Sequence, residues 1–147
     1  MFKYLTREQR VREFHETFGC MLDHPLSEGD EGIEDLESRR RLIREEGKEV
    51  LEAFDDMKVE LALGRTPSPE HWAHLLKELT DLQYVLSGTV IAFKNLNLKE
   101  FDIAFNRTHA SNMSNLGEDG KPIKQPNGKI VKGPNYKDPD LLDLIGS

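Results

Sequence analysis

The chain has 147 residues, of which 32% are charged, and its formal net charge is −7 at pH 7. The length suits one domain with its own core, and 37% hydrophobic residues is not the composition of a disordered chain. The acidic balance argues against nucleic-acid binding, which depends on neutralising phosphates with Lys and Arg. A single cysteine, Cys20, excludes an internal disulfide and a thiolate zinc site. Because no apolar run is long enough for a membrane span and no signal-peptide core is present, we expect a soluble, cytoplasmic protein.

Apolar residues recur at helical spacing in four segments of the chain. The first segment begins with Thr6 and Gln9, which match a capping box. The third begins with Ser68 as N-cap and Pro69 in the first turn, directly after a loop that starts at Gly64. The four predicted helices are Thr6 to about Leu22, about Ile33 to Leu63, Pro69 to about Phe93, and Leu98 to about Asn112.

The character of the sequence changes from Ser114, where Gly, Pro, Asn and Lys become frequent. Residues 121–132 predict a small β-hairpin that turns at Asn127-Gly128, and a tail with a short turn near its end follows. We therefore predict an all-α fold, a four-helix bundle with a short C-terminal hairpin and tail. It would form a single domain over residues 1–147, with a helical core of about 6–113 and a flap and tail of about 114–147.

Two carboxylate-rich segments, one on the second predicted helix and one on the third, form the most informative motif. Glu46 lies three residues before Glu49, and Glu78 three residues before Asp81, so each pair shares one face of its helix. Facing residues of two antiparallel helices have a constant sum of residue numbers, and the pairs 46/81 and 49/78 satisfy this condition. The four side chains can therefore converge across one helical hairpin.

Four carboxylates without His or Cys form an all-oxygen site, which selects Mg²⁺ or Mn²⁺ rather than zinc. Like charges one turn apart destabilise a helix unless a cation lies between them. Each segment taken alone is also typical of a solvated acidic helix face, so the prediction depends on the two together. A di-iron carboxylate bundle needs Glu-x-x-His motifs, and neither Glu46 nor Glu78 has a histidine three residues later.

With these residues the sequence resembles the MazG-like, all-α NTP pyrophosphohydrolases. Their signature, Glu-Glu-x-x-Glu followed by Glu-x-x-Asp, is matched by Glu45, Glu46, Glu49, Glu78 and Asp81. Further similarity, from about Phe14 to Leu141, is to the branch that includes dUTPase-like and phosphoribosyl-ATP-pyrophosphohydrolase-like proteins. It is carried by Phe14-His15, His109–Ser114, Gly120–Ile123, Asn127–Lys129 and Lys132–Pro134. Asn115 departs from that pattern, where a lysine is expected.

The resemblance implies hydrolysis of a nucleoside triphosphate between the α- and β-phosphates, which gives a monophosphate and pyrophosphate. Mg²⁺, for which Mn²⁺ can substitute, would be held by the four carboxylates of the two pairs. Glu45 would orient or deprotonate the attacking water, although an ordinary surface glutamate explains this residue equally well. The substrate would be dUTP or another (deoxy)nucleoside triphosphate, removed to clean the nucleotide pool.

The candidate substrate contacts are His15, Arg107, Asn112, Lys121 and Lys132. All of them except Arg107 have a simpler interpretation: His15 as a packed core histidine, Asn112 as a helix end, and the lysines as a solvated hairpin. The resemblance also implies a homodimer or a dimer of dimers, and we expect neither a nucleic-acid nor a membrane partner. The alternative function is a non-catalytic helical module that binds nucleotides for regulation.

Overall fold

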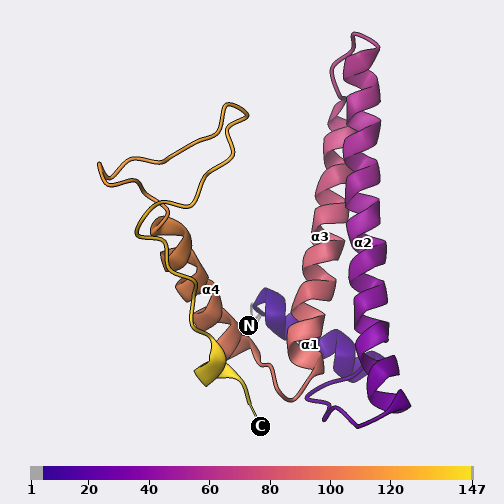
Figure 1. Ribbon diagram of the computed structural model, residues 1–147. Helices are drawn as coiled ribbons and strands as arrows, with labels where there is room; N and C mark the ends of the chain where they lie inside the picture. Colours follow the sequence, from indigo (N-terminus) through magenta and orange to yellow (C-terminus); the bar gives the residue numbers. More distant parts are fainter. Residues whose placement is uncertain (1–4, 147) are drawn as a thin grey trace. The chain divides into compact units, whose positions relative to one another are not determined.

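The structure, a computed structural model, describes residues 5–146 of the chain (Figure 1). It contains four α-helices and one 3₁₀ turn, so the prediction of an all-α fold with four helices is confirmed. The helices are α1 (Arg7–Phe18), α2 (Asp30–Ala62), α3 (Pro69–Ala92) and α4 (Leu98–Met113), and the 3₁₀ turn η1 is Leu142–Leu144. Within residues 5–146, no helix is both long and apolar enough to cross a membrane.

Local capping chemistry decides where the first helices begin and end. At the start of α1 the Thr6 and Gln9 side chains bond to each other's backbone N–H, at 3.1 and 2.8 Å, as the capping box predicts. The helix ends earlier than predicted because Gly19 adopts a left-handed conformation, with φ of 67°. Ser68 caps α3 as predicted, accepting from the His71 N–H at 3.4 Å, and Pro69 follows it.

The described residues divide into two compact units, one up to Lys94 and one from Asn95 onward. In the first unit, α2 and α3 run antiparallel as a long hairpin and α1 packs on α3 (Figure 1). Burial of aliphatic side chains, about 1.5–3 kcal/mol for each large one, holds the hairpin together. Its core consists of Val50, Ala53 and Met57 of α2 and Leu75 of α3, with Leu82 packed against them.

A buried arginine joins α2 to the C-terminal half of α3. Arg39 is buried, and its guanidinium donates to the Val85 carbonyl at 3.0 Å and the Thr89 hydroxyl at 3.2 Å. His15 of α1 is also buried and its Nδ1 lies 2.7 Å from the Met21 carbonyl. These polar bonds fix α2 and the end of α1 in place, since buried polar groups are costly without partners.

In the second unit, α4 packs against the C-terminal segment. The Ser111 hydroxyl donates to the Lys137 carbonyl at 2.6 Å, and Arg107 forms an ion pair with Asp143 at 2.6 Å. The Gly146 N–H donates to the Asn95 carbonyl at 3.1 Å, which ties the two ends of this unit together. The C-terminal segment is thus anchored along α4 by side-chain and backbone bonds.

The predicted β-hairpin over residues 121–132 is not present as a pair of strands, and this part of the prediction is corrected. The chain turns where expected, with Gly128 at φ of 85°, but an isolated bridge from Lys124 to Ile130 replaces a ladder. Pro126 lacks the N–H that a ladder needs. Two short strands without a third strand or a covering helix are also marginal in water.

Gly88 of α3 provides a test of this packing. A Cβ at this position would meet Arg39 Nη2 and His15 Nε2, each at 2.8 Å, so Gly88→Ala should destabilise the protein by about 1–3 kcal/mol. Gly47→Ala is the matched control, because nothing lies within 4 Å of its Cβ and alanine favours a helix by about 1 kcal/mol. Urea unfolding of both variants measures the difference, and equal stabilities would contradict the described packing.

Candidate metal centre

The α2–α3 hairpin brings together the four carboxylates that the sequence predicts as a group. Glu46 and Glu49 come from α2, and Glu78 and Asp81 come from α3. One carboxylate oxygen of each residue lies within 4.8 Å of the corresponding oxygens of the other three. The helical spacing and the antiparallel pairing of the two segments therefore produce a compact acidic cluster.

Two of the four carboxylates, those of Glu46 and Glu78, each have one buried oxygen without a protein partner. Glu78 is only 4% exposed, and its Oε2 has no hydrogen-bond partner among the described residues. The same holds for Oε2 of Glu46. A buried, unpaired carboxylate oxygen is costly, and a divalent cation removes that cost. The oxygens present are those that Mg²⁺ or Mn²⁺ prefers, so the residues fit such an ion.

The surroundings of the cluster shift the pKa of one acidic residue, Glu46, and of one basic residue, Lys77. Burial, followed by the charges of Glu49 and Asp81, raises the pKa of Glu46 above its ordinary value. Lys77 lies beside the cluster, with Nζ 2.8 Å from Asp81 Oδ2 and 3.3 Å from Glu78 Oε1. Hydrogen bonds to these two carboxylates raise the pKa of the Lys77 ammonium.

Lys77 and His74 are contacts of the cluster that the sequence analysis missed. His74 Nδ1 lies 3.4 Å from Glu78 Oε1. His74 precedes Glu78 by four residues, and Lys77 precedes Asp81 by four residues. Side chains four residues apart are neighbours on a helix, so this spacing could have indicated both contacts from the sequence.

Two other predicted site residues lie in the same unit but outside the cluster. Glu45 is on α2 beside Glu46 and is exposed to solvent. His15 is buried, and its ring bonds to the Met21 carbonyl. Their roles as general base and substrate contact stay predictions.

The remaining predicted substrate contacts belong to the second unit. Arg107 is held in an ion pair with Asp143, and Lys132 Nζ lies 4.4 Å from the centre of the Tyr136 ring. Asn112 and Lys121 are exposed, near the end of α4 and in the segment that follows it. Their contacts with a substrate also stay predictions.

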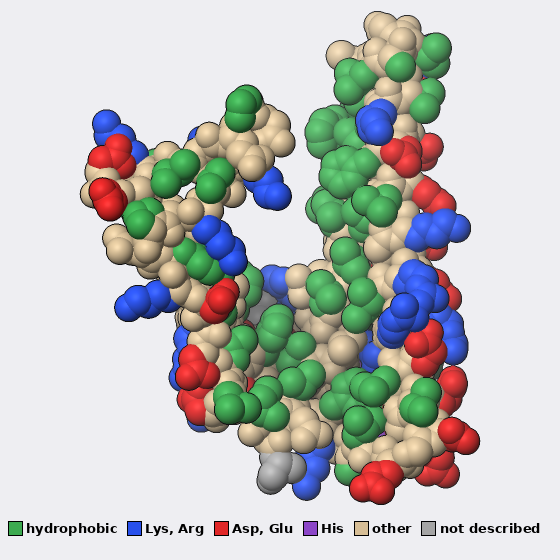
Figure 2. Space-filling view, in the orientation of Figure 1, with side chains coloured by type: hydrophobic (Ala, Val, Ile, Leu, Met, Phe, Trp, Pro, Cys, Tyr) green, Lys and Arg blue, Asp and Glu red, His purple; other side chains and the backbone are tan. Residues whose placement is uncertain are grey.

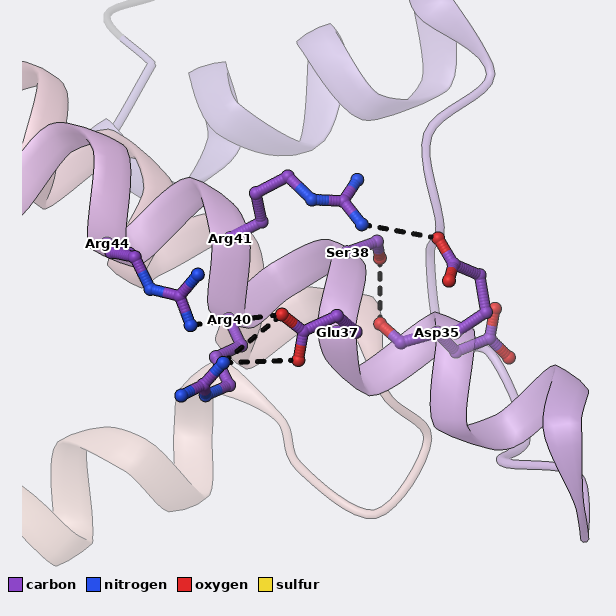
Figure 3. Close-up of polar contacts among 7 residues, drawn as sticks. Asp35, Glu37, Ser38, Arg40, Arg41 and Arg44 are labelled. Carbon is purple, nitrogen blue, oxygen red and sulfur yellow. Dashed lines mark hydrogen bonds and ion pairs between the residues drawn. The ribbon is translucent and has the colours of Figure 1, made fainter.

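A second group of charged side chains lies on the first half of α2 (Figure 3). Arg40 pairs with Glu37 at 3.2 Å, and Arg44 lies 3.9 Å from the same carboxylate. Arg41 pairs with Glu34 at 3.5 Å. The three arginines thus share two acidic residues of the same helix, and the group is a surface ion-pair network.

A sequence model of the phosphoribosyl-ATP pyrophosphohydrolase family matches residues 11–109, which include all of α2 and α3. The chain belongs to this family. The resemblance to MazG-like NTP pyrophosphohydrolases is thereby confirmed, and all four clustered carboxylates fall within the matched residues.

The solved structures similar to this chain include a protein from Exiguobacterium sp. 255-15, provisionally described as an NTP pyrophosphohydrolase, with 22% sequence identity and a TM-score of 0.35. The alignment covers 93% of this chain and 90% of that one. No curated protein matches the sequence.

The raised pKa of Glu46 gives a pH-dependent test in metal-free protein. An acid whose folded pKa lies above its unfolded value, ordinarily 4.5, destabilises the fold at neutral pH, and this effect disappears as pH falls towards 4.5. Glu46→Gln should therefore raise the free energy of unfolding at pH 7, with a gain that shrinks on acidification. Urea unfolding in a chelator between pH 5 and 8 measures it.

The control for this test is Glu52→Gln, on the same helix but exposed and paired with Lys48 at 3.6 Å. It should give no comparable gain. A pH-independent effect of Glu46→Gln would contradict the electrostatic origin of the shift.

Proposed function

We propose that this protein is a metal-dependent pyrophosphohydrolase that cleaves a nucleoside triphosphate between its α- and β-phosphates. The products would be a nucleoside monophosphate and pyrophosphate. The observation that carries the proposal is the convergence of Glu46, Glu49, Glu78 and Asp81 from two antiparallel helices. These residues stand at the metal-binding positions of the signature that the sequence shares with the MazG-like enzymes.

The oxygens of the four clustered carboxylates are the ligands proposed for Mg²⁺, for which Mn²⁺ could substitute. A divalent ion bound there supplies positive charge that offsets the charge of the phosphate oxygens. The apolar core of the hairpin, which includes Ala53 and Leu75, fixes the relative positions of the four ligands before the substrate binds. The backbones of the two helices therefore need not rearrange to form the site.

Glu45 is the proposed general base, since it directly precedes Glu46 on α2 and its carboxylate is open to solvent. It would accept a proton from water as the water oxygen bonds to phosphorus, while the bond from phosphorus to the leaving phosphate oxygen breaks. The proposed substrate contacts are His15, Arg107, Asn112, Lys121 and Lys132. The substrate class is a nucleoside triphosphate such as dUTP, and phosphoribosyl-ATP belongs in the same assay because of the family name.

Replacing Glu49 tests the metal site and the activity together. Glu49→Gln keeps the size of the side chain but removes one charge, so pyrophosphate release should fall by at least about 100-fold. Metal-free stability should stay level or rise because like-charge repulsion is relieved. The thermal stabilisation produced by Mg²⁺ should shrink. Pyrophosphate release from a nucleotide panel and thermal unfolding with and without Mg²⁺ measure these effects.

Glu52→Gln is the control, because it removes the same charge from α2 outside the cluster. It should behave like the wild type in both assays. Wild-type hydrolysis by Glu49→Gln would refute the metal-site interpretation. The alternative function, a nucleotide-binding module without turnover, predicts nucleotide binding by the wild type with no pyrophosphate release.

We also propose that the chain forms at least a homodimer. Hydrophobic side chains gather along one side of the α2–α3 hairpin, and charged side chains gather along the other (Figure 2). Leu51 and Phe54 of α2 and Trp72 and Leu76 of α3 are all exposed, at spacings that place them on one face of each helix. An uncovered apolar stripe of this kind is typical of an interface between proteins. A second copy of the hairpin would cover it.

A charge in this stripe tests the dimer. Leu76 is 67% exposed in the single chain, so Leu76→Glu should fold normally but disrupt the interface. Sedimentation should show the wild type with at least twice the 16.9 kDa chain mass and the variant as a monomer. Lys58→Glu, an exposed position of α2, is the control for an added negative charge. A monomeric wild type would exclude the proposed dimer.

A further inference from the structure

We propose that Lys77 is a counter-ion built into the metal centre, which a divalent cation must displace in order to bind. This inference rests on the proposed function, because it concerns the same site. The Lys77 ammonium contacts Asp81 Oδ2 at 2.8 Å and Glu78 Oε1 at 3.3 Å. It therefore engages two of the four proposed metal ligands, both on α3.

The contacts of Lys77 differ from those of the ordinary lysine pairs on this hairpin. Lys48 and Lys58 each contact one exposed carboxylate of α2, at 3.6 Å in both cases. Lys77 contacts two carboxylates, and one of them, Glu78, is buried. Its positive charge is therefore directed at the acidic cluster, whereas those lysines stabilise only local surface pairs.

An ammonium and a divalent cation cannot both lie close to the same carboxylates without repelling each other. The Lys77 side chain is 61% exposed and has a flexible four-carbon stem, so it can swing into solvent at little cost. Lys77 is thus the cation that can leave when metal binds.

Lys77 and a divalent cation therefore compete for the same carboxylates, and this competition sets the metal concentration at which the site is occupied. Without metal, Lys77 reduces repulsion among the carboxylates and stabilises the hairpin. With metal, the same charge opposes binding. Removing Lys77 should therefore lower metal-free stability and tighten metal binding, which is the opposite of the effect expected for Glu49→Gln.

The test is titration calorimetry of chelator-treated protein with Mn²⁺ alone, without nucleotide. Lys77→Met should bind Mn²⁺ with a Kd about two- to fivefold lower than the wild type, the range for one exposed ion pair. Lys77→Arg keeps the charge and should retain the wild-type Kd. Lys58→Met, which removes an equivalent charge from an exposed pair on α2, should also leave it unchanged.

Thermal unfolding in a chelator supplies a second readout. Lys77→Met should unfold at a lower temperature than both the wild type and Lys58→Met, because its carboxylates lose their internal cation. The difference should disappear as Mn²⁺ is added, because the ion then replaces the Lys77 charge at the carboxylates of the wild type. An ordinary surface ion pair that is independent of the metal would leave the difference unchanged at every Mn²⁺ concentration.

An unchanged or higher Kd in Lys77→Met would overturn the inference, as would equal tightening in Lys77→Arg, because charge would then not be the cause. If Glu49→Gln loses Mn²⁺ binding while Lys77→Met is unchanged, the role of Lys77 is wrong and the proposed metal site stands. A wild-type protein that binds no Mn²⁺ would overturn both.

Discussion

Four carboxylates held side by side across one helical hairpin are the constraint on which the rest of the structure depends. Two unit charges about 5 Å apart repel by about 3 kcal/mol at an effective dielectric constant of about 20. That repulsion is comparable to the burial of one large aliphatic side chain, about 1.5–3 kcal/mol. The hairpin offsets this repulsion with an apolar core, which begins at Val50, immediately after Glu49, and continues through Ala53 and Met57. The acidic site and the core are therefore adjacent parts of the same two helices, and a cation at the site relieves the strain that the core must otherwise oppose.

The parts of the fold that local rules control could be predicted from the sequence. The capping residues Thr6 and Ser68 mark true helix starts, since a cap depends on neighbouring residues. The four carboxylates could also be grouped in advance, because helical spacing and antiparallel pairing are simple geometric conditions. The end of α1 at Gly19 is harder to predict, since the apolar spacing continues beyond a glycine whose conformation stops the helix. The missing strands near Gly128 have a similar cause: the turn is local, but a ladder needs further packing partners.

Contacts between side chains distant in sequence could not be predicted in the same way. From the sequence, Arg107 is expected to be a cation without a partner, yet its guanidinium binds Asp143, far along the chain. His15 reads as a residue on a helix face, yet its ring is buried against the Met21 carbonyl after the chain turns at Gly19. In both cases the partner lies beyond the end of the helix that carries the residue. The chemistry of a candidate residue can therefore be recognised from its type, but its availability to a substrate depends on tertiary contacts.

The division of the hairpin into two faces explains how one pair of helices can serve two purposes. On α3, Glu78 and Asp81 are three residues apart, and Trp72, Leu76 and Leu79 follow one another at spacings of four and three. At 100° per residue these two sets point to different sides of the helix. On α2 the same argument separates Glu49 from the exposed Leu51 and Phe54. A protein that covered the apolar stripe would thus not cover the carboxylates, so that assembly through one face and access of a charged substrate to the other need not conflict. The periodicity of the α-helix alone is sufficient to produce this separation.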